Sequence, residues 1–237
     1  VNLSVDGVGD LSSVFRGKDL FKTADRAIDL LIRAGVPTGI NCVLGRKNYP
    51  GLKDLFAYAK TKGVNEIEIL RFKPAGRAVS SYGKHACTHD QNRELVPMLA
   101  DLSKEYGIQA KIDCSFIPML CWHNPPMEAL TTLSTYGCEA GNVLLGIKSS
   151  GAVSGCSFLQ ETGTSVFDYK DGFSRDKAME SLISWTDRAP EPCRSCDYLD
   201  ICRGGCRAVS LAVAGDMNAP DPDCPRVRQW EKTGGKT

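Results

Sequence analysis

Four of the eleven cysteines in this 237-residue chain lie within the stretch Cys193–Cys206, and Cys138, Cys156 and Cys224 flank them. The four are spaced C-x2-C-x5-C-x3-C, with C-x12-G-x4-C before them and one cysteine after. Two residues between thiolates let both sulfurs reach one centre, so the pattern indicates metal ligation. Zinc sites and [4Fe–4S] clusters both take four thiolates. Seven cysteines divide poorly into zinc sites, but they suit one four-cysteine cluster and a second site with three protein sulfurs.

The composition is ordinary for a folded chain, with 24% charged and 42% hydrophobic residues. A net charge of +1 creates no strong field toward nucleic acid, and no apolar run approaches the roughly 20 residues that span a bilayer. We therefore expect neither nucleic acid nor a membrane as a partner. With no signal peptide at its start, the chain is expected to be cytoplasmic, where dense cysteines favour metal binding over disulfides.

The first hundred residues alternate between strand and helix patterns. The sequence predicts strands at 1–6, 36–45 and 64–72 and near 108–113, and helices at 19–35, 50–63 and 90–106. Repeated strand–helix units imply parallel strands joined by right-handed crossovers.

Beyond this region glycine, proline and cysteine become more frequent and helical periodicity fades. We therefore place a domain boundary near residue 110, giving domains 1–110 and 111–237. The second domain is expected to contain a β-hairpin over 142–158, with its turn at 149–151, and short helices over 175–185 and 206–215.

The strands carry a polar face as well as an apolar one. Ser4 and Asp6 alternate with apolar residues in the first strand, as do Glu66 and Glu68 in the third. A parallel sheet buried on both faces is almost continuously apolar, so the polar face predicts a lumen lined for binding, as in a barrel or partly open barrel. Active-site groups in such folds lie at the C-terminal ends of the strands, where Ser4 and Asp6 stand. Asp6-Gly7 also suits a simple turn.

These motifs resemble those of the radical S-adenosylmethionine enzymes that carry a C-terminal SPASM domain. The similar stretches in the second half are "GCEAG", "SSGAVSGC", "CRSCDYLDICRGGCRA" and "DPDC". In the first half, "LSVDG", the helix ending in "AGV" and "EILRFKPAGRA" are similar to the fourth to sixth strands of that family's barrel. The resemblance covers nearly the whole chain. It implies an α/β fold, in which the C-terminal half of a partial (β/α) TIM-like barrel precedes a cysteine-rich SPASM/twitch domain with a β-hairpin and short helices.

By this resemblance the second domain holds two auxiliary [4Fe–4S] clusters. The outer cluster would be ligated by Cys193, Cys196, Cys202 and Cys224, and the inner one by Cys138, Cys156 and Cys206. The fourth inner position is left open: Cys121, taken here as the predicted ligand, Cys114, or a site open to substrate. A small buried hydrophobic role is the simpler one for Cys114. Cys42 and Cys87 are expected to be structural.

The resemblance also implies that the first domain binds S-adenosylmethionine. The residues expected to contact it are Ser4, Asp6, Asn41, Leu70, Arg71 and Phe72. Ser4 and Asp6 match the motif for the ribose and amino acid portion, and Asn41 is expected to face the lumen. The three residues from Leu70 to Phe72 are expected to line the adenine pocket. Arg16 is expected either to contact the cofactor or to cap local carbonyls.

The defining cluster loop of the family, C-x3-C-x2-C, does not occur in the chain. The spacing Cys202-x3-Cys206 matches the first part of this loop, but the third cysteine would have to be residue 209, which is Val. The chain also starts without Met inside an expected strand, so we expect a C-terminal fragment, inactive alone, with a third cluster upstream and catalytic residues unidentified. The intact protein is expected to form a 5′-deoxyadenosyl radical and to need a reductant such as flavodoxin or ferredoxin.

One departure from the family narrows the substrate. In sulfatase-maturing members an Asp base follows the cysteine that ends G-x4-C, whereas Ser157 follows Cys156 here. A hydroxyl of far higher pKa does not replace that base at neutral pH. We therefore expect a ribosomally made peptide or protein as substrate, joined by a crosslink or thioether. The rival hypothesis is a non-catalytic zinc-binding or iron–sulfur-binding module for electron transfer or structure.

Overall fold

The computed structural model describes residues 1–16, 20–168 and 177–235, which form two compact units. The first unit comprises 1–72 and 82–116, and the second comprises 73–81 and the described residues from 117 onward. The grouping of 73–81 with the second unit was not predicted from the sequence.

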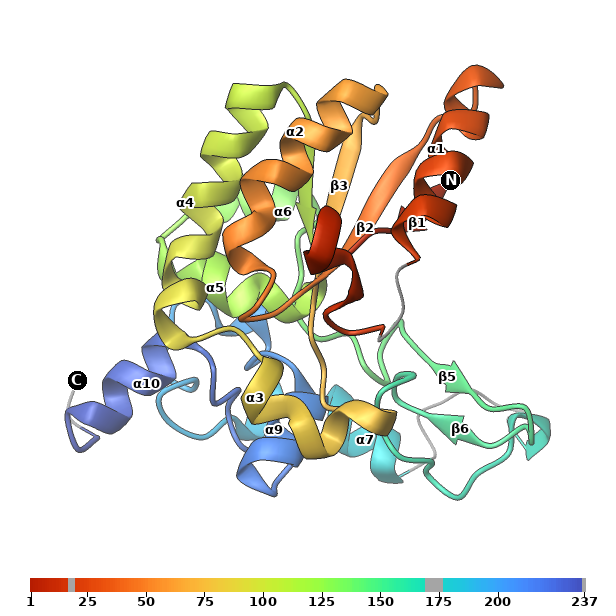
Figure 1. Ribbon diagram of the computed structural model, residues 1–237. Coiled ribbons are helices and arrows are strands. Elements are labelled where there is room, and N and C mark those ends of the chain that lie inside the picture. The colour runs from red at the N-terminus through yellow and green to blue at the C-terminus, as the bar shows by residue number, and fades with distance from the viewer. Residues whose placement is uncertain (17–19, 169–176, 236–237) are drawn as a thin grey trace. The chain divides into compact units, whose positions relative to one another are not determined.

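A four-stranded parallel sheet with strand order β1-β2-β3-β4 forms the centre of the first unit (Figure 1). Its strands are β1 (Asn2–Ser4), β2 (Gly39–Leu44), β3 (Glu66–Arg71) and β4 (Gln109–Ile112). Ser4 pairs with Asn41, and Asn41 pairs with Glu68, so these three polar residues form one row across the sheet. The predicted parallel strand–helix repeat is confirmed.

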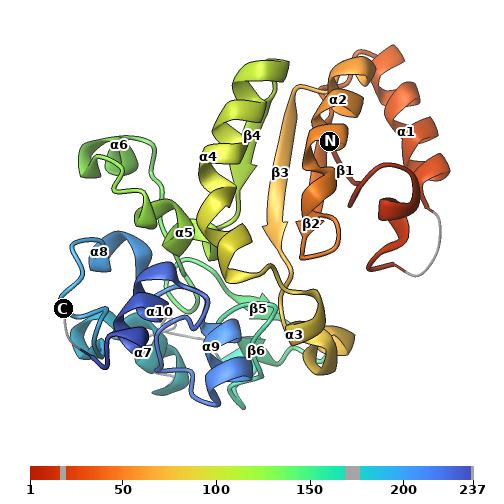
Figure 2. The same ribbon diagram turned by 60° about the vertical axis from the view of Figure 1, so that its left-hand side comes forward.

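The helices between the strands are α1 (Phe21–Arg33), α2 (Leu52–Lys62), α3 (Tyr82–His85) and α4 (His89–Tyr106). Helices α1, α2 and α4 form a layer alongside the sheet (Figure 2). Helix α4 begins with a capping box, in which the Gln91 amide donates to the Thr88 hydroxyl and the Thr88 amide donates to the Gln91 side chain. Gly63 and Gly107 end α2 and α4 in the left-handed conformation, as their positions in the sequence predicted.

The two faces of the sheet differ, as the alternation predicted. One face is packed, because Ile40, Cys42, Ile67 and Ile69 are all buried. The other face is partly exposed and polar, and Asn2 connects two strands across it by donating to Asn41 at 2.9 Å and to Glu66 at 3.4 Å. Short 3-10 turns complete the unit: η1 (Gly9–Ser13), η2 (Tyr49–Gly51) and η4 (Cys114–Phe116).

The second unit is built from short elements joined by irregular chain. Its helices are α5 (Ile117–Trp122), α6 (Met127–Thr132), α7 (Lys177–Ile183), α8 (Leu199–Cys202), α9 (Arg207–Ala214) and α10 (Pro225–Lys232), with 3-10 turns η3 (Gly76–Ser81), η5 (Val166–Asp168) and η7 (Thr186–Arg188). The predicted hairpin is present as the antiparallel pair β5 (Gly146–Ile147) and β6 (Val153–Ser154). The first two residues of the helix predicted over 175–185 lie outside the described residues.

Among the described residues, no helix combines the length and the hydrophobicity needed to cross a bilayer.

Candidate metal centre

A hollow in the second unit is lined by five cysteines. Four of them form the outer set that the sequence predicted, and the fifth is Cys121: the lining cysteines are Cys121, Cys193, Cys196, Cys202 and Cys224. Pro118, Pro192 and Leu199 contribute apolar surface between them. All but Cys196, which is half-buried, are buried. The fold therefore collects sulfur ligands from distant parts of the chain around one space.

Local structure explains how the outer set reaches the hollow. A tight turn joins Cys193 to Cys196, whose amide donates to the Cys193 carbonyl at 3.1 Å. Cys202 is the last residue of α8, and Cys224 is the N-cap of α10. Pro225 occupies the first position of α10, where its fixed φ favours helix initiation and its missing amide hydrogen matters least.

The loop after α8 turns back through three consecutive residues with left-handed backbone. Arg203, Gly204 and Gly205 have φ values of 51°, 70° and 81°. A Cβ on Gly204 would lie 2.1 Å from Cη2 of Trp185, and a Cβ on Gly205 would lie 2.3 Å from Cβ of Asp221. Both the backbone conformation and the close approach therefore require glycine at these two positions.

Two buried charged side chains hold the same loop in place. The Asp221 carboxylate, which is 0% exposed, accepts hydrogen bonds from the amides of Cys206 at 2.9 Å and Asp223 at 3.0 Å. Arg207 is also buried, and its guanidinium donates to the Ala219 carbonyl at 3.1 Å. Hydrogen bonds to charged groups are among the stronger ones in proteins, so this pair fixes the backbone around Cys206. Sequence reasoning missed both residues, because only the folded chain brings them to the loop.

The environment of the hollow favours neutral thiols when no cation is bound. Burial raises the pKa of Cys193 to about 12, and it also raises the pKa values of Cys196 and Cys224. A hydrogen bond to the Cys121 sulfur, followed by burial, raises the pKa of Cys202 well above its ordinary value. Bound metal reverses this preference, because thiolates are its ligands and their protons are released on binding.

In the metal-free chain the sulfurs of the hollow are not gathered around a single ion. Within residues 1–16, 20–168 and 177–235, no three His, Cys, Asp or Glu side chains lie close enough to hold one metal ion. Tetrahedral zinc, with bonds of about 2.3 Å, requires its sulfurs to lie about 3.8 Å apart. A cubane, with one thiolate on each of its four irons, requires a wider spacing of the sulfurs than zinc does.

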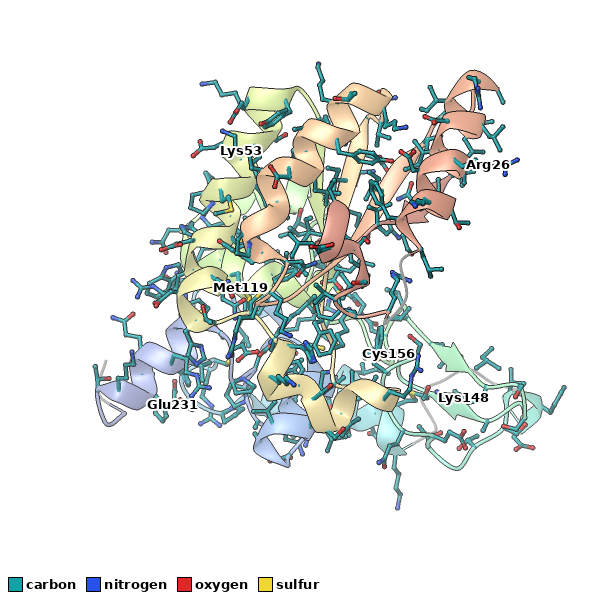
Figure 3. The ribbon with its side chains drawn as sticks, in the orientation of Figure 1. Arg26, Lys53, Met119, Lys148, Cys156 and Glu231 are labelled. Atoms are coloured by element: carbon teal, nitrogen blue, oxygen red, sulfur yellow. The ribbon has the colours of Figure 1, made fainter. Side chains whose placement is uncertain are left out.

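The predicted inner set lies on three other segments of the second unit. Cys206 is the N-cap of α9, and Cys156 follows β6, near Lys148 in Figure 3. Burial raises the pKa of Cys156, and the Cys138 sulfur adds to the shift, so these two side chains lie within electrostatic reach. Glu139, the residue after Cys138, forms an ion pair with Arg203 at 2.7 Å. This ion pair ties the Cys138 segment to the loop that leads to Cys206.

The remaining cysteines occupy different environments. Cys121 lies beside Cys202 in the lining of the outer hollow, whereas sequence reasoning offered it as an inner ligand. Cys42 is 1% exposed on β2, as expected of a structural cysteine. The expectation that Cys114 is a buried hydrophobic residue is wrong, because Cys114 is exposed at the start of the 3-10 turn that follows β4.

The residues predicted to bind a nucleoside are divided between two environments. Ser4 is exposed, and Asn41 and Leu70 are half-buried on the open polar face of the sheet. Arg71 and Phe72 are buried within the first unit. The Arg71 guanidinium donates to the Ser115 carbonyl at 2.9 Å, and Phe72 stacks with Phe15, their ring centroids 5.0 Å apart. Ser4, Asn41 and Leu70 therefore share the open face of the sheet, whereas Arg71 and Phe72 do not.

The Asp6 carboxylate forms its hydrogen bonds with residues of the first unit. Its carboxylate, in a residue 2% exposed, accepts from Arg16 Nε at 2.7 Å and from the Val43 amide at 3.0 Å. Asn48, a buried residue that sequence reasoning missed, donates to the Asp6 carbonyl at 2.6 Å and to the Val43 carbonyl at 2.8 Å. These contacts fix the ends of β1 and β2 next to Ser4.

The fold and the site define a class of protein. It combines a parallel α/β sheet that has an open polar face with a cysteine-rich unit in which five cysteines line one hollow. No family-level sequence model matches the chain.

Individual proteins, however, match nearly all of the chain. It is 29% identical over 236 residues to the mycofactocin maturase MftC of Mycolicibacterium smegmatis, covering 97% of this chain and 57% of that protein. It is 27% identical to the AdoMet-dependent heme synthase of Oleidesulfovibrio alaskensis, covering 94% and 60%. It is also 27% identical to the PqqA peptide cyclase of Ruegeria pomeroyi, covering 84% and 52%.

Solved structures share the fold. Streptococcus suis SuiB bound to S-adenosylmethionine matches with a TM-score of 0.67 and 18% identity, over 94% of this chain and 53% of that one. Native anSMEcpe with bound AdoMet and Cp18Cys peptide matches with a TM-score of 0.68 and 18% identity, over 98% and 66%. Over nearly its whole length the chain is therefore similar to radical S-adenosylmethionine enzymes that include peptide maturases, and it spans a little over half the length of the curated relatives it matches.

Proposed function

We propose that the intact protein is a radical S-adenosylmethionine enzyme that modifies a ribosomally made peptide or protein. This chain would contribute part of the cofactor-binding barrel and two auxiliary iron–sulfur sites. S-adenosylmethionine, cleaved at a cluster held elsewhere in the intact protein, would supply the radical that takes a hydrogen atom from the substrate. The chemistry belongs to the cofactors, and the chain binds them, orients them and excludes water.

The single observation that carries this proposal is the hollow lined by Cys193, Cys196, Cys202 and Cys224. These are the four cysteines that the resemblance assigned to one cluster, and the fold brings them to the same hollow. The two left-handed glycines at 204 and 205 let the backbone turn sharply between the outer set and Cys206. The same loop therefore positions a ligand of each proposed site.

The first unit supports a polar cofactor on the open face of its sheet. Ser4 offers a hydroxyl and Asn41 an amide there, and Leu70 lies on the same face with apolar surface. Asp6 would act through position rather than contact, because its pair with Arg16 and its bond to Val43 hold the strand ends that present Ser4. A purine nucleoside needs both hydrogen-bonding groups and apolar surface, and this face supplies both.

A peptide substrate is supported by the similarity to the PqqA peptide cyclase and to the anSMEcpe structure with its bound Cp18Cys peptide. A second candidate, a tetrapyrrole, is favoured by the similarity to the AdoMet-dependent heme synthase. The two are distinguished by incubating the intact enzyme and S-adenosylmethionine anaerobically with a candidate precursor peptide or with an iron porphyrin. Mass spectrometry then shows which substrate changes mass.

Metal analysis tests the cluster assignment on the chain itself. After anaerobic reconstitution with iron and sulfide, we expect about eight irons and eight sulfides per chain, four for each cluster. A parallel sample given equimolar zinc is the control, because a structural zinc module would select zinc. A colourless protein that binds zinc and no iron would overturn the proposal in favour of the non-catalytic module.

A further inference from the structure

The outer hollow contains one more cysteine than a cubane needs. A [4Fe–4S] cluster takes four thiolates, and the motif already supplies them. Cys121 nevertheless lines the same space and is 2% exposed. Its position in the sequence, ahead of the hairpin and outside the seven-cysteine pattern, gives no indication that it belongs there.

Cys121 is held in this place by contacts from the outer-set segments. It lies on α5, which packs against both α8 and α10. The Arg226 guanidinium, from α10, donates to the Cys121 carbonyl at 2.9 Å. The Tyr198 hydroxyl, from the residue before α8, donates to the Pro125 carbonyl at 2.8 Å. The C-terminal end of α5 and the residues that follow it are therefore fastened to α10 and to the start of α8.

Among the outer sulfurs, Cys202 is the neighbour of Cys121. A side-chain hydrogen bond links the Cys202 and Cys121 thiols. The two thiols therefore form a pair on one wall of the hollow.

We propose that Cys121 is a fifth sulfur of the outer site, which hydrogen-bonds Cys202 and replaces it as an iron ligand when Cys202 is lost. This inference rests on the proposed cluster site. In the native arrangement the Cys202 thiolate binds iron and the Cys121 S–H donates a hydrogen bond to it. When the Cys202 sulfur is absent, Cys121 loses its proton to solvent and its thiolate forms the fourth iron–sulfur bond. No oxidant or reductant is needed.

Four variants test the proposal by metal content rather than activity. They are Cys202→Ala, Cys196→Ala, Cys121→Ala and the double variant Cys121→Ala/Cys202→Ala, each reconstituted anaerobically and analysed for iron, sulfide and electron paramagnetic resonance. We expect Cys202→Ala and Cys121→Ala to keep the iron content of the wild type. Cys196→Ala and the double variant should each lose about four irons per chain. Cys42→Ala, a buried cysteine of the first unit, is the matched control for loss of a sulfhydryl.

Three results would overturn the inference. Cys202→Ala losing as much iron as Cys196→Ala would show that Cys121 does not replace it. A double variant with full iron content would show that neither sulfur is needed. Loss of iron from Cys121→Ala alone would make Cys121 an obligatory ligand rather than a reserve one. Far-UV circular dichroism of each reconstituted variant separates ligand loss from misfolding. A wild-type chain that binds no iron would instead contradict the proposed function.

Discussion

Alanine at Gly205 should destabilise the cysteine-rich unit more than alanine at another left-handed glycine. A positive φ costs a non-glycine residue about 1–2 kcal/mol, and this applies alike to Gly205 at +81° and Gly215 at +72°. At Gly205 the new Cβ would also lie 2.3 Å from Cβ of Asp221, so that side chain has to move. Its carboxylate accepts from the amides of Cys206 and Asp223, and losing one hydrogen bond to a charged group costs about 1.5–3 kcal/mol.

Gly215→Ala is the matched control, because no atom lies within 4 Å of the Cβ it would gain. We expect it to lower the free energy of unfolding by about 1–2 kcal/mol, and Gly205→Ala to lower it by about 2.5–5 kcal/mol. An excess of about 2 kcal/mol is roughly a 30-fold change in the unfolding equilibrium. Urea unfolding followed by tryptophan fluorescence and circular dichroism measures both variants. Equal losses of unfolding free energy in the two variants would refute the claim that the Asp221 hydrogen bonds stabilise the loop around Gly205.

Three further predictions concern the first unit and the metal. Arg16→Ala should destabilise the chain by about 1–3 kcal/mol in thermal melts, because it leaves the buried Asp6 carboxylate without its ionic partner. The loss stays in this range because the Arg16 side chain is partly exposed to solvent. Arg16→Lys should recover part of the lost stability. Hydrogen bonds from Lys62 and Tyr58 hold the pKa of Asp25 below its ordinary value. These bonds therefore stabilise the folded state at neutral pH, and this stabilisation is lost as the pH falls through the lowered pKa. Lys62→Met should therefore cost under about 1 kcal/mol at pH 7 and nothing at about pH 2 in urea titrations. Iron chelation should lower the melting temperature of the reconstituted chain toward that of the apo chain in calorimetry, since a ligand of the folded state alone stabilises it.

The regular part of the first unit was predictable because its signals are local. Period-two alternation in β3 placed Ile67 and Ile69 on the buried face and left Glu66 and Glu68 on the other. Gly107 marked the end of α4 because its left-handed φ is one that other residues adopt only with strain. Such features depend on neighbouring residues, and the sequence shows those directly.

The contacts that complete the sites depend on distant residues. Asp6 appeared free to face a ligand, but the 3-10 turn η1 returns Arg16 to its carboxylate. Cys121 carries no motif, and it reaches the outer hollow only because α5 packs against helices that follow about 80–105 residues later. Cys114 is exposed for the same kind of reason: burial is set by what packs over a turn, and the residue type does not determine that.

The central claim is that two separate sets of cysteines hold two separate clusters. Electron paramagnetic resonance of the reduced, reconstituted chain tests it most directly, with Cys196→Ala interrupting the outer set and Cys156→Ala the inner set. Each variant should lose about four irons and a different component of the signal, so that the two remaining spectra add up to that of the wild type. Loss of the same component in both variants, or retention of both components in either, would contradict the account.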